Sequence, residues 1–140
     1  MAKGYAGRYL NVNLTSGVCS HFSLEDDLLR KFLGGSSRFT VCAKSPLTGI
    51  WGEGACGGTF GPELKRAGYD GILIVGKAQS PTTLSIIEGE ARLIDASDLW
   101  GKDIYQTTDL LKKKDKGLKV KGLLSHPVKL VRLTKIMSVL

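Results

Sequence analysis

The stretch Arg8-Tyr9-Leu10-Asn11-Val12-Asn13-Leu14 decides how the fold begins, because its apolar residues recur at every second position. This period of two places Leu10, Val12 and Leu14 on one face of a β-strand. Turn-forming residues follow in Thr15-Ser16-Gly17, and residues 18–22 alternate again. The opening of the chain therefore predicts a β-hairpin with one buried face.

The residues after this hairpin predict short helices set among further strands. A helix is expected from Leu24 to Leu33, with Ser23 as its N-cap and Gly34 at its end. Further helices are expected from Phe60 to Ala67 and from a start near Asp98 or Asp103. The further strands expected are Arg38 to Ala43, Ile72 to Val75, Thr82 to Ile87 and Ala91 to Ile94. Strands outnumber helices and follow no βαβ rhythm, so we expect an α+β fold with largely antiparallel sheets and two or three short helices.

Length and composition limit the class of protein. A chain of 140 residues, 42% of them hydrophobic, fits one domain with a single core. The first residues lead into no apolar segment of a secretory signal, and the longest aliphatic run, Ile72 to Val75, is far shorter than a membrane span. We therefore expect a cytoplasmic protein with no membrane contact.

The net charge of +7 is concentrated at one end of the chain. From residue 112 onward nine basic residues face one acidic residue, a net charge of +8, whereas residues 1–111 carry eleven basic and twelve acidic residues, a net charge of −1. A basic tail can attract nucleic acid, but this one has no interleaved aromatic residues and no known nucleic-acid module. We interpret it as a solvated run of charge.

The three cysteines, Cys19, Cys42 and Cys56, are scattered and form no C-x-x-C pair. An odd, separated set does not indicate a disulfide framework, so we expect buried thiols that pack like small hydrophobic side chains. Because iron–sulfur clusters and zinc sites need grouped thiolates, we expect neither on this chain.

The most suggestive local feature is the Gly-rich stretch Gly52-Glu53-Gly54-Ala55-Cys56-Gly57-Gly58. Clustered glycines before a helix let backbone N–H groups approach an anion. Arg38, just upstream, could add a bidentate guanidinium contact to a phosphate. A tight turn packed against other backbone, and a solvated arginine, account for the same residues without a ligand. No catalytic constellation of side chains is evident.

Ordered blocks of sequence carry a resemblance to a known family. The blocks are residues 6–17, Phe32-Leu33-Gly34-Gly35, residues 38–49, residues 57–71, Val75-Gly76-Lys77-Ala78 and residues 95–102. Together they resemble the N-terminal domain of the tungsten-dependent aldehyde ferredoxin oxidoreductase family, from Gly4 to about Leu111. The fold expected from this resemblance is that domain's α+β type.

The resemblance implies a tungsten bis-pterin cofactor and names the residues that contact it. Arg38 matches the family's pterin-contacting arginine, and Ala55, Cys56, Gly57 and Gly58 match the loop that meets the pterin and its bridging magnesium. Better-known members carry an asparagine where Ala55 stands, and a methyl group cannot ligate a hard cation. Either a backbone oxygen and water replace the amide, or the magnesium site is weakened.

Two larger departures from the family bear on the function. Several dozen residues that the family has between Gly35 and Ser36 are missing, and after Lys119 the family's second pterin loop is replaced by a divergent sequence. We therefore divide the chain into a domain over residues 1–111 and a basic tail over residues 112–140. The cluster cysteines and acid–base residues of the family's helical domains are also absent.

These departures leave two hypotheses open. In the first, the chain is the cofactor-binding domain of an enzyme that oxidises aldehydes to carboxylates. It would then be inactive alone, and would need a separate chain carrying the helical domains to pass electrons to ferredoxin. In the second, it is a non-catalytic binding or scaffold protein that has lost the cofactor.

Overall fold

The hairpin predicted at the start of the chain is confirmed in the computed structural model, which describes residues 4–31, 38–45 and 47–114. Strand β1 (Tyr9–Asn13) pairs antiparallel with β2 (Val18–Phe22). On its other side β1 pairs in parallel with β5 (Gly71–Val75), so the sheet has the order β2-β1-β5. Leu10 and Val12 are fully buried, as their alternation predicted.

A second hairpin lies against the first sheet. Strands β6 (Thr82–Ile87) and β7 (Glu90–Asp95) pair antiparallel, and β7 lies beside β2. The two residues between the strands, Glu88 and Gly89, have φ values of 51° and 82°. Two consecutive positive φ values are typical of the tight turns whose twist matches that of a hairpin.

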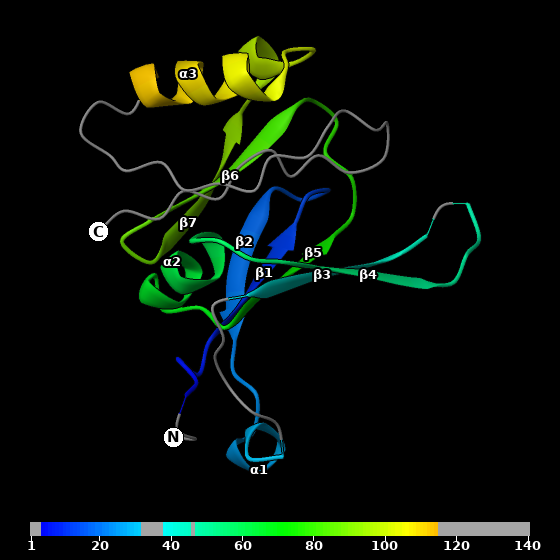
Figure 1. Ribbon diagram of the computed structural model, residues 1–140, viewed down its shortest axis with the longest axis vertical. Coiled ribbons are helices and arrows are strands. Elements are labelled where there is room, and N and C mark those ends of the chain that lie inside the picture. The colour runs from blue at the N-terminus through cyan, green and yellow to red at the C-terminus, as the bar shows by residue number, and fades with distance from the viewer. Residues whose placement is uncertain (1–3, 32–37, 46, 115–140) are drawn as a thin grey trace.

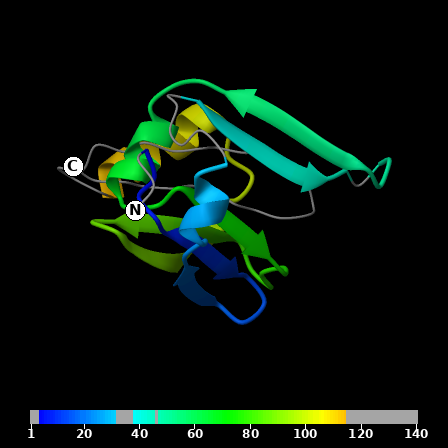
Figure 2. The ribbon, with the colours of Figure 1, turned by 90° about the horizontal axis from the view of Figure 1, so that it is seen from below.

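The third pair of strands is a long ribbon formed by β3 (Phe39–Lys44) and β4 (Trp51–Cys56). Figures 1 and 2 both show its tip projecting beyond the rest of the molecule. The expectation that residues 52–58 form a loop running directly into a helix is wrong for the part that is β4. Three of the six residues of β4 are glycine or alanine, which give no period-two pattern, so the pairing with β3 makes the strand.

One helix is shorter than the sequence predicted, and the other two agree with the prediction. Helix α1 covers only Asp26–Leu29 rather than Leu24 to Leu33, and Ser23 does not cap it. Leu29 is the one buried residue of α1, and an amphipathic helix with so little buried surface gains little stability from packing. Residues 32 and 33, the last two of the predicted helix, lie outside the described residues.

Helix α2 (Phe60–Arg66) agrees with the prediction within one residue. Helix α3 (Ile104–Lys114) follows a short 3₁₀-helix, Ser97–Leu99. The carboxylate of Asp103 accepts a hydrogen bond of 2.7 Å from the N–H of Gln106, so Asp103 rather than Asp98 marks the start of α3. Of the basic tail expected over residues 112–140, the part from residue 115 onward lies outside the described residues.

One core joins these elements, with a small second cluster beneath α3. Apolar side chains from β1, α2 and β6 meet in the main core, which consists of Leu10, Val12, Leu14, Phe60, Leu64, Tyr69, Leu84 and Ile86. The second cluster is Ala96, Leu99 and Leu111. Among the described strands three pairs are antiparallel and one is parallel. The α+β class with mainly antiparallel pairing is therefore confirmed.

No helix within the described residues is long and apolar enough to cross a membrane. The expectation of buried thiols is wrong for Cys42 and Cys56, which are exposed on the ribbon. Cys19 on β2 is half-buried, and this burial raises the pKa of its thiol.

Candidate cofactor-binding site

The structure brings the predicted site residues to one end of the β3–β4 ribbon. Phe39 pairs with Cys56 at the last rung of the ladder, so Arg38 and Gly57 each lie one residue beyond it. Opposite residues in antiparallel strands have Cα atoms about 4.5–5.5 Å apart. Arg38 and Gly57, which are 19 residues apart in sequence, therefore lie near each other in space.

The site is open to solvent. Arg38, Ala55, Cys56, Gly57 and Gly58 are all exposed. A Cβ atom added to Gly57 or to Gly58 would meet nothing within 4 Å, so the loop borders open space. Gly58 has a φ of +109°, a conformation that side chains disfavour, whereas Gly57 is not in this region. Of these two residues, Gly58 is therefore the one whose backbone conformation requires glycine.

Ala55 and Cys56 face opposite sides of the ribbon, because successive residues of a strand alternate. Ala55 is paired with Thr40, and directly opposed side chains share a face. Thr40, whose hydroxyl-bearing side chain lies opposite the methyl group of Ala55, had not been predicted as a site residue from the sequence. The signal that could have found it is the register of β4, and that strand was not predicted.

The Cys56 and Phe39 side of the ribbon is the side that contacts the body of the protein. The Cys56 Sγ donates to the carbonyl of Gly57 at 3.4 Å, and both groups are exposed. The ring of Phe39 meets the ring of Phe60 edge-on, with centroids 4.7 Å apart. Phe60 is the first residue of α2, so this contact fixes the end of the ribbon to that helix.

Glu53 is exposed on the ribbon, and its carboxylate accepts a hydrogen bond of 3.4 Å from the indole N–H of Trp51. Within residues 4–31, 38–45 and 47–114 there is no group of three or more His, Cys, Asp or Glu side chains that could hold a metal ion. At the end of the ribbon where Phe39 pairs with Cys56, the described residues bring the guanidinium of Arg38 to a Gly-rich backbone.

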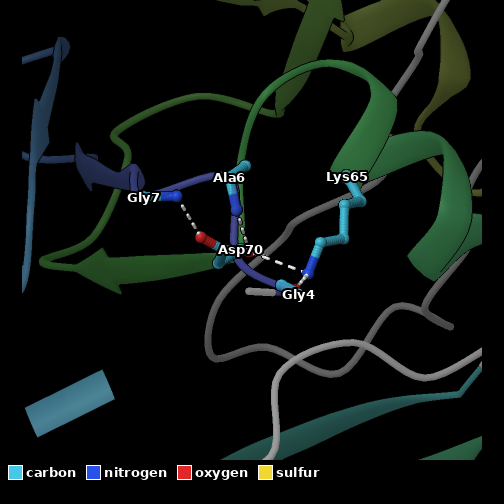
Figure 3. Close-up of polar contacts among 5 residues, drawn as sticks. All are labelled: Gly4, Ala6, Gly7, Lys65 and Asp70. Carbon is cyan, nitrogen blue, oxygen red and sulfur yellow. Dashed lines mark hydrogen bonds and ion pairs between the residues drawn. The ribbon is translucent and has the colours of Figure 1, made fainter. Parts of the chain in front are cut away.

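A separate polar cluster, shown in Figure 3, ties the start of the chain to the turn before β5. The carboxylate of Asp70 accepts hydrogen bonds from the N–H groups of Ala6, at 2.9 Å, and Gly7, at 2.7 Å. The ammonium group of Lys65 lies 3.1 Å from the same carboxylate and also donates to the carbonyl of Gly4. With a side chain only 3% exposed, Asp70 is a structural clip that aligns β1 with β5.

Comparison of the chain with known proteins identifies its family. The family described as "Aldehyde ferredoxin oxidoreductase, N-terminal domain" matches residues 35–125. The chain is 33% identical over 149 residues to the tungsten-containing aldehyde ferredoxin oxidoreductase of Pyrococcus abyssi, covering 79% of this chain and 24% of that protein. It is 31% identical to the Pyrococcus furiosus protein of the same name, covering 84% and 26%.

One further relative by sequence and one solved structure match a similar share of the chain. The WOR-like subunit of an aliphatic sulfonate oxidoreductase from Pyrococcus furiosus is 29% identical, covering 88% of this chain and 27% of that subunit. The active site complex BamBC of benzoyl coenzyme A reductase, solved with 1,5-dienoyl-CoA, superimposes with a TM-score of 0.72 at 25% identity, covering 81% and 23%. The chain thus spans about a quarter of the length of these proteins. Its sequence and its fold together show that it belongs to the aldehyde ferredoxin oxidoreductase family, as a member of the N-terminal domain type.

Proposed function

We propose that this chain binds the phosphate groups of a pterin cofactor at the end of the β3–β4 ribbon. The observation that carries the proposal is the strand register, which sets Arg38 against the loop of Gly57 and Gly58. A guanidinium offers a planar fork of N–H donors that matches two phosphate oxygens. Gly57 and Gly58 are exposed and carry no side chains of their own, so their backbone can approach a ligand closely.

The described residues fit a phosphate better than a magnesium ion. Magnesium prefers oxygen ligands in an octahedral arrangement and usually keeps several waters. Ala55 offers no side-chain oxygen, and the nearest one across the ladder belongs to the hydroxyl of Thr40. We propose that Thr40, backbone carbonyls and water take over what the family's asparagine supplies.

The relatives named as tungsten-containing enzymes support a tungsten bis-pterin as the cofactor. When bound, this group would supply the redox chemistry that oxidises an aldehyde to a carboxylate and passes electrons toward ferredoxin. In this proposal the chain itself binds and orients the cofactor and performs no chemical step.

We further propose that a segment present in the relatives is missing between Gly35 and Ser36. The alignment with the Pyrococcus abyssi protein spans 149 positions, whereas 79% of 140 residues is about 111, so about 38 positions of the relative have no counterpart here. The family match begins at residue 35, which supports placing the gap there.

A partner chain that carries the helical domains would complete the enzyme. Its contact surface would include the ribbon, because four large apolar side chains are exposed there: Val41, Leu47, Ile50 and Trp51. Without a partner, we expect no aldehyde-dependent reduction of a viologen dye by the purified chain. Dye reduction by the chain alone at rates comparable to those of complete enzymes would contradict this proposal.

The test of binding is a calorimetric titration of pterin monophosphate against the wild-type chain and two variants, with and without magnesium. Arg38→Lys keeps the charge but loses the bidentate contact, so we expect binding to weaken about 5- to 10-fold, the value of one hydrogen bond. Ala55→Asn restores an amide oxygen and should strengthen only the magnesium-dependent part of the affinity. If wild type and Arg38→Lys bind equally, or neither binds, the scaffold hypothesis takes the place of this one.

A further inference from the structure

We infer that the aromatic pair Phe39–Phe60 is a positioning device that sets the span between Arg38 and the Gly57–Gly58 loop. This inference rests on the proposed function, because it explains how that site keeps its shape. Neither ring is expected to touch the ligand. Each ring acts on a neighbour in sequence: Phe39 directly follows Arg38, and Phe60 follows Gly58 after one residue.

The two phenylalanines close a small ring of contacts around the loop. Phe39 is held to Cys56 by the last rung of the strand ladder, and it is held to Phe60 by the edge-on contact at 4.7 Å. Only residues 57–59 connect Cys56 to Phe60 along the chain. A loop of three residues whose two ends are fixed has few conformations left, so its N–H groups are presented in a defined direction.

The ring pair is also the anchor of the ribbon. Phe39 is half-buried, whereas the other five residues of β3 are exposed, and Phe60 is only 9% exposed as part of the main core. A Cβ atom at Gly61 would lie 3.5 Å from the carbonyl oxygen of Arg38, so the start of α2 lies close to the backbone of Arg38. The pair of rings and the backbone beside it thus connect Arg38 to the core.

The contact between the two rings contributes enough free energy to affect the geometry of the site, but too little to determine whether the chain folds. Edge-on aromatic pairs contribute beyond their buried area by an amount that corresponds to about 2- to 10-fold in an equilibrium constant. Loss of the Phe39 ring should therefore let the arginine and the loop move independently, and binding of a phosphate should weaken by about that factor. The core side chains on β1 and β6 keep their contacts.

The experiment uses the full 140-residue chain and three variants. Phe39→Leu removes the ring, Phe39→Tyr keeps it, and Phe22→Leu is the matched control. Phe22 stacks on Tyr9 with centroids 5.6 Å apart, on a different sheet from the ribbon. The measurements are ¹⁵N relaxation order parameters for the Gly57 and Gly58 amides and the Arg38 side chain, the thermal midpoint of unfolding, and titration with pterin monophosphate.

We expect Phe39→Leu to lower the order parameters of the loop and of Arg38 and to weaken binding about 2- to 10-fold. Phe39→Tyr should restore both, and Phe22→Leu should change neither. The inference is overturned if the order parameters are unchanged in Phe39→Leu, or if they fall as much in Phe22→Leu. If the loop loosens selectively while wild type binds no pterin, the positioning role stands and the proposed function fails.

Discussion

At the scale of single residues, Asp70 illustrates how one buried carboxylate can hold distant segments together. Its oxygens accept the N–H groups of Ala6 and Gly7, more than 60 residues away in sequence, and Lys65 balances its charge. Hydrogen bonds to a charged group contribute more than neutral ones, and a buried donor left without a partner is costly.

We therefore expect Asp70→Asn to lower the free energy of unfolding by about 2 kcal/mol, measured by urea denaturation. The asparagine keeps the shape and one acceptor oxygen but replaces the other oxygen with an NH₂ group, so the N–H group of Ala6 or of Gly7 loses its acceptor. The matched control is Glu90→Gln, which removes an ion pair of 2.8 Å with Arg92 between two largely exposed side chains. That change should lower the free energy of unfolding by less than about 0.5 kcal/mol. Equal losses of stability in the two variants would contradict the role of Asp70 as a structural clip.

Tyr9 gives a second test at the same scale, in which pH is varied. Burial, and then the carboxylate of Asp70, raise the pKa of the Tyr9 phenol above its ordinary value of 10.0. The fold therefore favours the protonated phenol. Its contribution to stability is complete below the unfolded pKa and is lost as pH rises through the folded pKa.

Tyr9→Phe cannot ionise, so its free energy of unfolding should fall less than that of wild type between pH 9 and about pH 11. Urea denaturation at a series of pH values measures this difference. Parallel pH profiles for wild type and variant would show that the environment of Tyr9 does not disfavour its ionisation.

At the scale of elements, the sequence predicted what depends on local patterns. The alternation of Leu10, Val12 and Leu14 identified β1, and the turn at Glu88-Gly89 separates two strands whose ends were predicted within one residue. The pairing of β1 with β5 was not predicted, because no local pattern links strands about 60 residues apart. Helix α1 begins later than predicted, and within Asp26–Leu29 only Leu29 is buried, so little packing supports a longer helix.

In the candidate site, too, local patterns predicted some features, whereas others depend on strand pairing. Arg38 and the Gly-rich stretch were singled out from the sequence, and the resemblance then assigned Arg38 and residues 55–58 to the pterin. Their meeting at one end of a ribbon depends on β4, whose glycine and alanine residues give no period-two pattern. Thr40 and Phe39 were missed as parts of the site for the same reason. Once the register is known, Thr40 lies opposite Ala55 and Phe39 opposite Cys56.

At the scale of the whole molecule, the protein combines a packed body with an exposed site. The core side chains of β1, β6 and α2 are buried, whereas the β3–β4 ribbon, one end of which is the proposed cofactor site, exposes Val41 and Trp51. The chain spans about a quarter of the length of its relatives. These features support the proposal that the chain is a cofactor-binding domain of a larger assembly.

The basic tail is the main competitor for any phosphate ligand, since residues 112–140 carry a net charge of +8. Attraction to such a tail is weak, shows no fixed geometry and falls as salt rises. Binding at the ribbon should persist at moderate salt, because a bidentate arginine contact has a defined geometry. The location of binding therefore separates the two possibilities better than the affinity does.

The most direct test of the central claim is a ¹H–¹⁵N chemical-shift map of the full chain titrated with pterin monophosphate at about 0.15 M salt, near the physiological ionic strength. The proposed function predicts saturable shifts of Arg38, Gly57 and Gly58, with the amides of Ala6 and Gly7 unchanged at the distant clip. Shifts confined to residues 112–140, or no saturable shifts at the end of the ribbon, would contradict it.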